Sequence, residues 1–311
     1  MPNILVVGSL NADLVVRASR FPQPGETISG DDLQVIPGGK GANQAVAAAR
    51  LGAHVSMLGR VGRDNFGDFL LNNLKSNHVD SQLVQRDDAS TGTAIIVVDT
   101  NGQNSIVLSA GANGKISTAD VEHASFLHHK LLLLQLEIPI PTVLRTAQRA
   151  KENNVRVILN PAPAKEIPDE LIALTDFIIP NETELSLLTG MEVKDIQSAE
   201  IAAHLLLQRA AQNVIVTLGS KGALIVTSAS AQATHVDTYP VNVVDTTAAG
   251  DAFIGGFAVA LDSSSLLDAV RYGCACGALA TTKFGAQPSL PTKEEVGAIL
   301  AVARGLTEKE L

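Results

Sequence analysis

The sequence predicts an α/β protein in which helices cover both faces of a doubly wound, mainly parallel β-sheet. Short apolar runs recur along the chain, and they are continuous rather than alternating, as is typical of strands buried on both faces. Helix-like segments separate these runs, which favours a parallel sheet. With 311 residues the chain is long enough for one large α/β core, and we expect residues 1–311 to form a single domain.

The expected elements alternate over most of the chain. Buried strands are expected at residues 4–7, 55–58, 131–136, 155–159, 177–179 and 214–217. Helices are expected at residues 45–51, 66–75, 143–153, 182–188 and 199–211, and the last third continues with helices at 252–261, 266–283 and 294–303. This order is typical of a sheet with helices on both faces.

Two pairs of segments depart from the alternation and predict a small accessory antiparallel sheet. They contain many β-branched residues and have no helix between them. The segments are residues 14–17 with 27–36 and residues 93–99 with 105–108, within approximate limits of 12–37 and 92–110. The second pair is joined by Asn101-Gly102, which favours a tight hairpin turn. The alternative is an edge extension of the main sheet with no moving part.

The composition is that of an ordinary soluble enzyme. A net charge of −9 argues against a nucleic-acid partner, because affinity for phosphate backbones depends on Lys and Arg. The N-terminus has no basic segment before its short apolar run, and no run approaches the ~18 to 20 apolar residues of a membrane span. We therefore expect a cytoplasmic protein with neither a nucleic-acid nor a membrane partner.

A turn of small residues before the helix at 252–261 predicts an anion-binding site. Ala248, Ala249 and Gly250 have little side-chain bulk, so their backbone N–H groups can approach a phosphate at the positive end of a helix. Asp251 follows in the first helical turn, where a carboxylate is stabilised as the anion and can accept a proton. The alternative is that Asp251 only caps a buried helix.

A second glycine-rich turn, at residues 37–44, leads directly into the helix at 45–51. It does not match the dinucleotide-binding fingerprint, because Gln44 stands where that motif needs its third glycine. No Walker-type phosphate loop occurs in the sequence either. The turn therefore belongs to neither of these nucleotide-binding classes.

Polar side chains stand beside the predicted strand ends, where open α/β sheets bind their ligands. These residues are Asn11, Asp13, Lys40, Asn43 and Glu137. Their carboxylates and amides could pair with vicinal hydroxyl groups, which suits a polyol ligand. The alternatives are a turn role for Asn11 and a solvated strand end for Glu137.

The two turns, in this order, resemble the two signatures of the ribokinase family, sugar kinases related to the minor phosphofructokinase. Further matching blocks are GSLNAD at residues 8–13, QLE at 135–137, NPAPA at 160–164, PNETE at 180–184, TLGSKG at 217–222 and GAQPS at 285–289. Together they cover essentially the whole chain. The resemblance implies transfer of the γ-phosphoryl group of ATP to the 5-hydroxyl of D-ribose.

The resemblance also assigns roles to residues. It implies that Asp251 is the general base, with the backbone N–H groups of Ala248, Ala249 and Gly250 around the phosphate. The implied sugar-binding residues are Asn11, Asp13, Gly39, Lys40, Asn43, Glu137 and Asp251. The implied ATP-binding residues are Asn181, Glu184, Thr217, Gly219, Gly222, Gly250 and Cys274. Cys274 is a departure, because family members often carry His or Asn at this position near the adenine.

Two metal ions are implied by the same resemblance. Asn181 and Glu184 would position Mg²⁺ through water, although these two residues also fit a helix N-cap with a capping box. The K⁺ positions are Asp245, Thr247, Ala280, Lys283, Gly285 and Ser289, several of them through backbone carbonyls. Lys283 would contribute its carbonyl rather than its ammonium group.

In the family the accessory sheet is a lid over the sugar and the contact of a homodimer, so we expect both here. A lid would exclude water from the transfer. Two other functions stay open: a related kinase for deoxyribose, another sugar or a nucleoside, and a non-catalytic sugar or nucleotide sensor. The sensor is disfavoured because Asp251 and both glycine-rich turns are intact.

Overall fold

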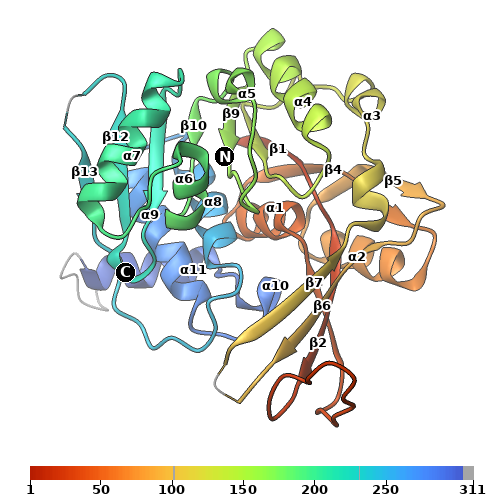
Figure 1. Ribbon diagram of the computed structural model, residues 1–311. Coiled ribbons are helices and arrows are strands. Elements are labelled where there is room, and N and C mark those ends of the chain that lie inside the picture. The colour runs from red at the N-terminus through yellow and green to blue at the C-terminus, as the bar shows by residue number, and fades with distance from the viewer. Residues whose placement is uncertain (101, 231, 304–311) are drawn as a thin grey trace.

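The protein is described here by a computed structural model that covers residues 1–100, 102–230 and 232–303 (Figure 1). In this described part, a nine-stranded sheet has the order β13-β12-β11-β10-β9-β8-β1-β4-β5. Its strands are β1 (Asn3–Val7), β4 (His54–Gly62), β5 (Asp80–Asp87), β8 (Leu131–Leu134), β9 (Arg156–Leu159), β10 (Phe177–Ile178), β11 (Asn213–Thr217), β12 (Ala223–Thr227) and β13 (Thr234–Val236). The strands from β11 to β5 are parallel, and β12 and β13 add two antiparallel pairs at one edge.

The predicted mainly parallel sheet is confirmed, and each of the six predicted strands is present. Sequence analysis missed β5, β12 and β13. Strand β5 lies at the sheet edge with half-exposed side chains, so it lacks the continuous apolar run that marks the central strands. The strand predicted at 131–136 ends at Leu134. Beyond it, the Leu136 N–H donates to the carbonyl of Ala162 at 2.8 Å.

Helices cover both faces of this sheet, as predicted. They are α1 (Lys40–Arg50), α2 (Asn65–Ser76), α3 (Thr118–Glu122), α4 (Ile140–Glu152), α5 (Asp169–Ala173), α6 (Glu182–Thr189), α7 (Ile196–Gln208), α8 (Ala249–Ala260), α9 (Leu266–Ala280), α10 (Ala286–Ser289) and α11 (Lys293–Ala303). Successive strand residues face opposite sides: Ile4 and Val6 join the core under α1, α8 and α9, while Leu5 and Val7 join the core under α4 and α7. A strand such as β1 is therefore buried on both faces.

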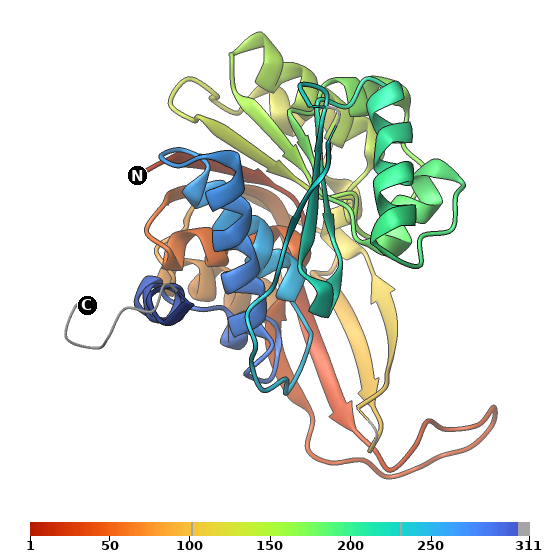
Figure 2. The same ribbon diagram turned by 90° about the vertical axis from the view of Figure 1, so that its left-hand side faces the viewer.

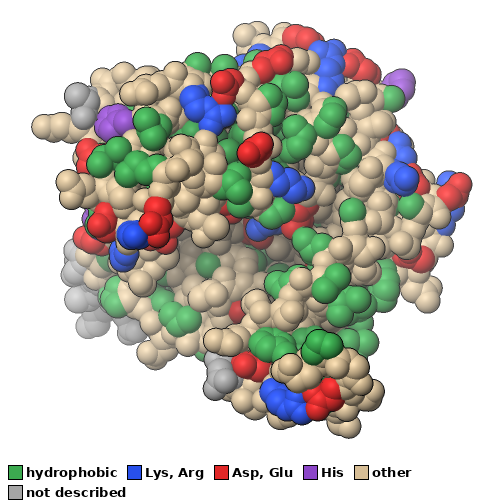
Figure 3. All heavy atoms as spheres, in the orientation of Figure 1, with side chains coloured by type: hydrophobic (Ala, Val, Ile, Leu, Met, Phe, Trp, Pro, Cys, Tyr) green, Lys and Arg blue, Asp and Glu red, His purple; other side chains and the backbone are tan. Residues whose placement is uncertain are grey.

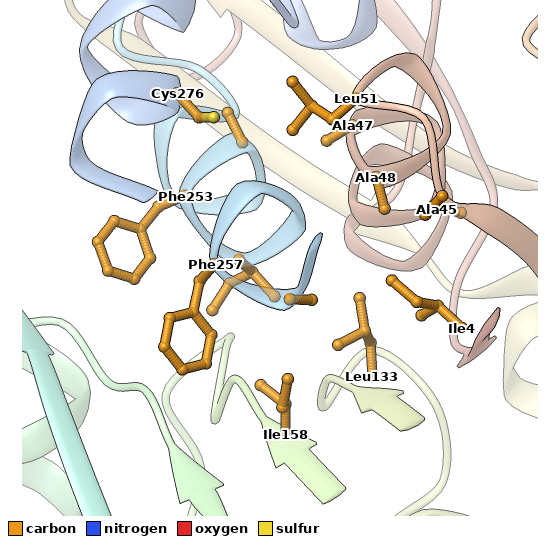
Figure 4. Packing of buried hydrophobic residues seen from close by; sticks show 14 of the residues in the cluster. Ile4, Ala45, Ala47, Ala48, Leu51, Leu133, Ile158, Phe253, Phe257 and Cys276 are labelled. Carbon is orange, nitrogen blue, oxygen red and sulfur yellow. The ribbon is translucent and has the colours of Figure 1, made fainter. Parts of the chain in front are cut away.

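Small residues allow α1 and α8 to pack closely together (Figure 4). A Cβ atom built on Gly255 of α8 would lie 2.6 Å from Cβ of Ala47 on α1, closer than two such atoms can approach. On the other side of α8, the rings of Phe253 and Phe257 stack with centroids 6.4 Å apart. Because the two helices touch near their middles, their N-terminal turns are held beside each other.

The accessory sheet is confirmed and projects from the main body (Figure 2). Its strands, in the order β3-β2-β6-β7, are β2 (Asn11–Arg17), β3 (Gln34–Gly38), β6 (Gly92–Val98) and β7 (Asn104–Ser109). The pairs β2–β3 and β6–β7 are antiparallel, while β2 and β6 join the two halves as a parallel pair. The strand expected at residues 27–36 begins only at Gln34.

The hairpin between β6 and β7 is closed by a hydrogen bond of 3.1 Å from Gly102 N–H to the carbonyl of Asp99, although Asn101 of the predicted turn lies outside the described residues. Within residues 1–100, 102–230 and 232–303, no helix combines the length and the apolar character that crossing a bilayer requires.

Candidate active site

The candidate site lies where the first turn of α1 meets the first turn of α8. Asp251, in the first turn of α8, is only 5% exposed. Its Oδ2 accepts a hydrogen bond of 2.9 Å from Asn43 Nδ2, and its Oδ1 accepts one of 3.0 Å from Gln44 Nε2. Two side chains of α1 thus hold the Asp251 carboxylate. These contacts differ from helix capping, which was the alternative considered for Asp251.

The turn before α8 leaves the first backbone N–H groups of the helix without a side-chain cap. Ala248, the N-cap residue, is left-handed with φ of 61°, and no side chain caps the helix. A Cβ atom built on Gly250 would meet no atom within 4 Å, so a ligand can reach this backbone. The N–H of Ala249 donates to the carbonyl of Thr246 at 3.2 Å, so in this state it does not face a phosphate. Gly250 and Asp251 provide the other N–H groups of the first turn.

The residues expected to bind a sugar gather between β2, the turn before α1 and the end of β8. Asn11, in β2, is 5% exposed and its Oδ1 accepts from Asn113 Nδ2 at 2.7 Å. Glu137 Oε2 accepts from Ser9 Oγ at 2.5 Å and from the backbone N–H of Lys40 at 3.1 Å. Neither residue matches its alternative description, since Asn11 is not in a turn and Glu137 is half-buried and hydrogen-bonded.

The glycines of the first turn leave room for the backbone of β2. Gly39 has φ of 88°, a left-handed conformation that favours glycine, and a Cβ atom there would lie 2.7 Å from the backbone nitrogen of Asn11. This close approach places Asn11 and Lys40 on the same side of the sheet. The hollow that results is visible between the main body and the accessory sheet, with acidic side chains inside it (Figure 3).

Several charges converge in this hollow. Burial, together with the negative charges of Glu137 and Asp251, raises the pKa of Asp13 from 3.8 to about 7. Burial lowers the pKa of Lys40, but the carboxylates of Asp251, Glu137 and Glu184 outweigh this effect and raise it overall. Lys40 is therefore the cation around which these carboxylates are arranged.

A cavity of ≈ 590 Å³ adjoins the first turn of α8 on its other side. It is lined by Asn181, Thr217, Gly219, Gly222, Gly250 and Cys274, together with apolar residues such as Phe253 and Val243. These are the residues that the sequence assigned to ATP, except Glu184. Burial raises the pKa of the Cys274 thiol to about 12, so this cysteine acts as a neutral apolar wall.

Glu184 and Asn181 form a reciprocal cap at the start of α6. Asn181 Oδ1 accepts from the Glu184 N–H at 2.8 Å, and Glu184 Oε2 accepts from the Asn181 N–H at 2.9 Å. The capping box considered from sequence is therefore present. Burial raises the pKa of Glu184, although its hydrogen bond from Asn181 and the charge of Lys40 oppose that shift. Its Oε1 also accepts from Asn181 Nδ2 at 3.0 Å, so the carboxylate is bound to a residue that lines the cavity.

Of the residues predicted for K⁺, Thr247 and Gly285 bond the carboxylate of Asp245. Its Oδ1 accepts from the N–H and Oγ1 of Thr247 at 2.9 and 2.7 Å, and its Oδ2 accepts from the Gly285 N–H at 2.9 Å. The Lys283 ammonium pairs with Glu295 at 2.5 Å, as expected if only its carbonyl faces the loop. Ala280 ends α9, and Ser289 is buried in α10 with its hydroxyl on the carbonyl of Ala286. The described residues contain no cluster of three His, Cys, Asp or Glu side chains able to hold a metal.

Sequence analysis missed three buried amides of the site: Gln44, Gln135 and Asn113. Gln44 and Gln135 were visible only as letters inside glycine-rich and strand-end motifs. Asn113 lies in a 3₁₀ turn and bonds both backbone groups of Leu10, at 2.9 and 3.0 Å. Their contacts join segments far apart in sequence, so only their presence in polar motifs near strand ends could have drawn attention to them.

Comparison with known proteins gives a consistent result. The model of the pfkB family carbohydrate kinases matches residues 1–293. The chain is 44% identical over 296 residues to a ribokinase of Haemophilus influenzae, covering 94% of this chain and 96% of that protein. It is 39% identical over 305 residues to a deoxyribokinase of Salmonella typhimurium, covering 96% and 99%.

The fold agrees with a solved structure. The ribokinase of Arabidopsis thaliana, crystallised with ribose and ATP, superimposes with a TM-score of 0.89 at 36% identity, covering 96% of this chain and 98% of that one. Both the main sheet and the accessory sheet therefore belong to a known architecture.

Proposed function

This chain belongs to the pfkB family of carbohydrate kinases, and we propose that it transfers the γ-phosphoryl group of ATP to the 5-hydroxyl of D-ribose, giving ribose 5-phosphate and ADP. The observation that carries the proposal is the position of Asp251 between the two halves of the site. Asn43, among the sugar-site residues, bonds its carboxylate, and the cavity at Gly250 lies in the same helical turn. A hydroxyl bound on one side could thus meet a phosphate bound on the other.

In the proposed mechanism Asp251 accepts the proton of the sugar's primary hydroxyl while the oxygen of that hydroxyl attacks the γ-phosphorus of ATP. The bond from that phosphorus to the bridging oxygen of ADP breaks, and the electron pair leaves with ADP. The N–H groups of Gly250 and Asp251, at the positive end of α8, stabilise the charge on the transferring group. Ala248 and Ala249 shape this turn.

The sugar would be held by residues that accept hydrogen bonds from its hydroxyl groups. We assign Asn11, Asp13, Gly39, Asn43 and Glu137 to this role, with Asp251 at the reacting hydroxyl, while the Lys40 ammonium would donate a hydrogen bond to a sugar oxygen. The Lys40 ammonium balances the carboxylates around it and lies within the field of Asp251. The carboxylates and amides of these residues offer several hydrogen-bond acceptors, which favours a polyol over an apolar acceptor.

The adjoining cavity would hold the nucleotide. Its glycines permit close backbone approach, and Phe253 and Val243 offer apolar surface to a base. Mg²⁺ would be held through water by Asn181 and Glu184, whose oxygens suit a hard cation that keeps its waters, and it would neutralise phosphate charge. K⁺ would be held by a carboxylate and by carbonyl oxygens near the start of α8. The residues assigned to it are Asp245, Thr247, Ala280, Lys283, Gly285 and Ser289.

The accessory sheet would act as the lid and as the contact of a homodimer. All six residues of β7 are exposed, and Ile106, Val107 and Leu108 are 49%, 65% and 52% exposed. Val107 lies beside Ile95 of β6, which is 50% exposed, on the face opposite to Ile106 and Leu108. Exposed apolar side chains on a sheet are a typical protein-contact surface. Hydrophobic side chains gather over this sheet in Figure 3. Under this proposal residues 1–311 work as one domain with a lid at about 12–37 and 92–110. We also propose a cytoplasmic location, where ATP is available.

A second candidate is a kinase for deoxyribose, favoured by the 39% identity to a deoxyribokinase. A site that bonds every hydroxyl rejects an analogue that lacks one, because a buried polar group then stays unpaired. An ATP-consumption assay over ribose, deoxyribose, hexoses and nucleosides tests both. The highest kcat/KM should belong to ribose. A preference for deoxyribose would replace the proposed acceptor, and no turnover with any acceptor would favour a sensor.

A further inference from the structure

A chain of buried side-chain amides leads through the protein interior to Asp251. Gln135 Nε2 donates to Gln44 Oε1 at 2.6 Å, and Gln44 Nε2 donates to Asp251 Oδ1 at 3.0 Å. Gln44 is 0% exposed and Gln135 is 1% exposed. Both glutamines are sealed from solvent, so the chain supports the carboxylate from behind rather than contacting a substrate.

The orientation of the Gln44 amide is fixed from two sides. Its Nε2 also donates to Asn160 Oδ1 at 3.2 Å, and Asn160 Nδ2 donates to the carbonyl of Ile179 at 3.0 Å. A backbone carbonyl can only accept, so Asn160 must turn its own oxygen toward Gln44. An ionised carboxylate also only accepts, so both neighbours require the NH₂ group of Gln44. A reversed amide would oppose oxygen to oxygen at both contacts.

Gln135 takes its orientation from Gln44. Within the described residues, Gln135 Oε1 is buried and has no hydrogen-bond partner, so that oxygen does not decide which way the amide points. The Gln44 oxygen decides the orientation of the Gln135 amide, because this oxygen needs a donor and Gln135 Nε2 supplies it. A Cβ atom on Gly8 would lie 2.1 Å from Gln135 Oε1, so glycine at that position leaves the space this amide occupies.

Gln44 and Asn43 together fix both oxygens of Asp251. They are consecutive residues in the first turns of α1, and each donates one hydrogen bond to a different carboxylate oxygen. A carboxylate held at both oxygens cannot rotate about its terminal torsion without breaking a bond. Asn43 is 5% exposed and belongs to the sugar-site residues, whereas Gln44 has no such second role.

On the basis of the proposed phosphoryl transfer, we propose that Gln44 is a positioning residue, whose buried amide holds the Asp251 carboxylate in the orientation that meets the attacking hydroxyl. The Gln135–Gln44–Asn160 chain is the support that keeps this amide in place. A misplacement of about 1 Å in a reacting group can cost roughly 10²-fold in rate. The effect of losing Gln44 should therefore fall on turnover and not on sugar binding.

The test compares Gln44→Met with Gln135→Met in steady-state assays with ribose and ATP. Methionine matches glutamine in size but cannot donate to Asp251. Q44M should lower kcat roughly 10- to 100-fold while KM for ribose changes by less than about 3-fold. Q135M keeps the bond between Gln44 and Asp251, so its loss of kcat should be clearly smaller. Equal losses in the two variants, or a loss confined to KM, would overturn the inference.

A double-mutant cycle with Asp251→Ala shows whether Gln44 acts through Asp251. In the D251A background, Q44M should change the residual kcat by less than about 2-fold, because the group it orients is gone. The same fold-loss in both backgrounds would show that Gln44 acts elsewhere. If thermal unfolding shows that Q44M does not fold, Gln44→Leu takes its place, since it is also uncharged and cannot donate to Asp251.

Crystal structures of the ligand-free wild type and Q44M separate this inference from the proposed function. The Asp251 side chain should change its torsion or become disordered in Q44M. An unchanged Asp251 would refute the positioning role, whatever the substrate proves to be. A wild-type protein that phosphorylates no sugar would refute the proposed function, while the torsion of Asp251 would still test the role of Gln44.

Discussion

The carboxylate of Asp13 occupies the space that a side chain at residue 38 would need. A Cβ atom built on Gly38 would lie 2.1 Å from Asp13 Oδ2, so the pairing of β2 with β3 encloses this carboxyl group in the protein. The enclosed Asp13 also lies near the negative charges of Glu137 and Asp251. Ionisation of Asp13 is therefore unfavourable in the folded protein, at the place where the sugar is proposed to bind.

Asp13 predicts a dependence of stability on pH. Burial and the neighbouring carboxylates raise its pKa from 3.8 to about 7, so between these values the folded protein keeps a proton that the unfolded chain has released. The free energy of unfolding should therefore fall as the pH rises from about 4 to about 7. Asp13→Asn removes this dependence, and at pH 8 the variant should exceed the wild type by up to roughly 4 kcal/mol. Urea denaturation at pH 5, 6, 7 and 8 measures the difference, and a difference that is constant with pH would contradict the prediction.

The proposed base predicts a loss of turnover without a loss of fold. Asp251→Ala should lower kcat roughly 10²- to 10⁴-fold, the usual contribution of a general base. Asp68→Ala is the matched control, because Asp68 also lies in the first turn of a helix, α2, but its side chain is 61% exposed and pairs with Arg86. Kinetics and circular dichroism of both variants decide the point. Near-normal turnover in D251A would remove Asp251 from the mechanism.

Gly250 predicts an effect on the phosphate site alone. Since a Cβ atom there meets nothing within 4 Å, Gly250→Ala should change the free energy of unfolding by less than about 1 kcal/mol. A methyl group at the mouth of the cavity should nevertheless hinder the nucleotide and lower kcat/KM for ATP about 10-fold or more. Gly297→Ala, in α11 and equally unhindered, should leave the kinetics unchanged. Unaltered ATP kinetics in G250A would show that the phosphates bind elsewhere.

The Asp245 loop predicts activation by a monovalent cation. At fixed Mg²⁺, activity should be higher in K⁺ than in tetramethylammonium, which is too large for a loop of carbonyl oxygens. Asp245→Ala removes the acceptor for Thr247 and Gly285, so the K⁺ concentration for half-activation should rise at least about 10-fold. Titration of K⁺ into both proteins provides the measurement. Equal rates in the two cations for the wild type would rule out a K⁺ site in this loop.

The exposed apolar side chains of β7 predict a dimer, and a charged residue introduced among them should dissociate it. Val107→Lys would place a charge in the proposed contact, and sedimentation velocity should show the wild type as a dimer and V107K as a monomer. Val302→Lys is the control, because Val302 is 74% exposed on α11, outside the accessory sheet. A monomeric wild type, or a dimer that survives V107K, would exclude this face as the contact.

Much of the fold could be predicted from sequence because burial on two faces leaves a clear signal. Strand β8 is apolar throughout and β1 is apolar after Asn3, and the positions of both were found. Strand β5 was missed because it lies at the sheet edge, and the parallel pairing of β2 with β6 could not be foreseen because it joins residues about 80 positions apart.

The candidate site divides in the same way. The backbone turns are local, so the sequence predicted the glycine-rich turn before α1 and the small-residue turn before α8 correctly. The donors to Asp251 are not local: Gln44 contacts it across 207 residues, and which end of its amide faces Asp251 depends on Asn160. The sequence can show that a glutamine is present but not what it holds.

The close packing of Gly255 against Ala47 sets the spacing between the proposed sites of the sugar and of ATP. This spacing does not depend on the strands that would recognise the sugar. Strands β2, β3, β6 and β7 can therefore diverge while the helix pair retains its geometry. This modular division would let one scaffold acquire new acceptor preferences through changes confined to its projecting sheet, whereas a side chain at residue 255 would push α1 and α8 apart.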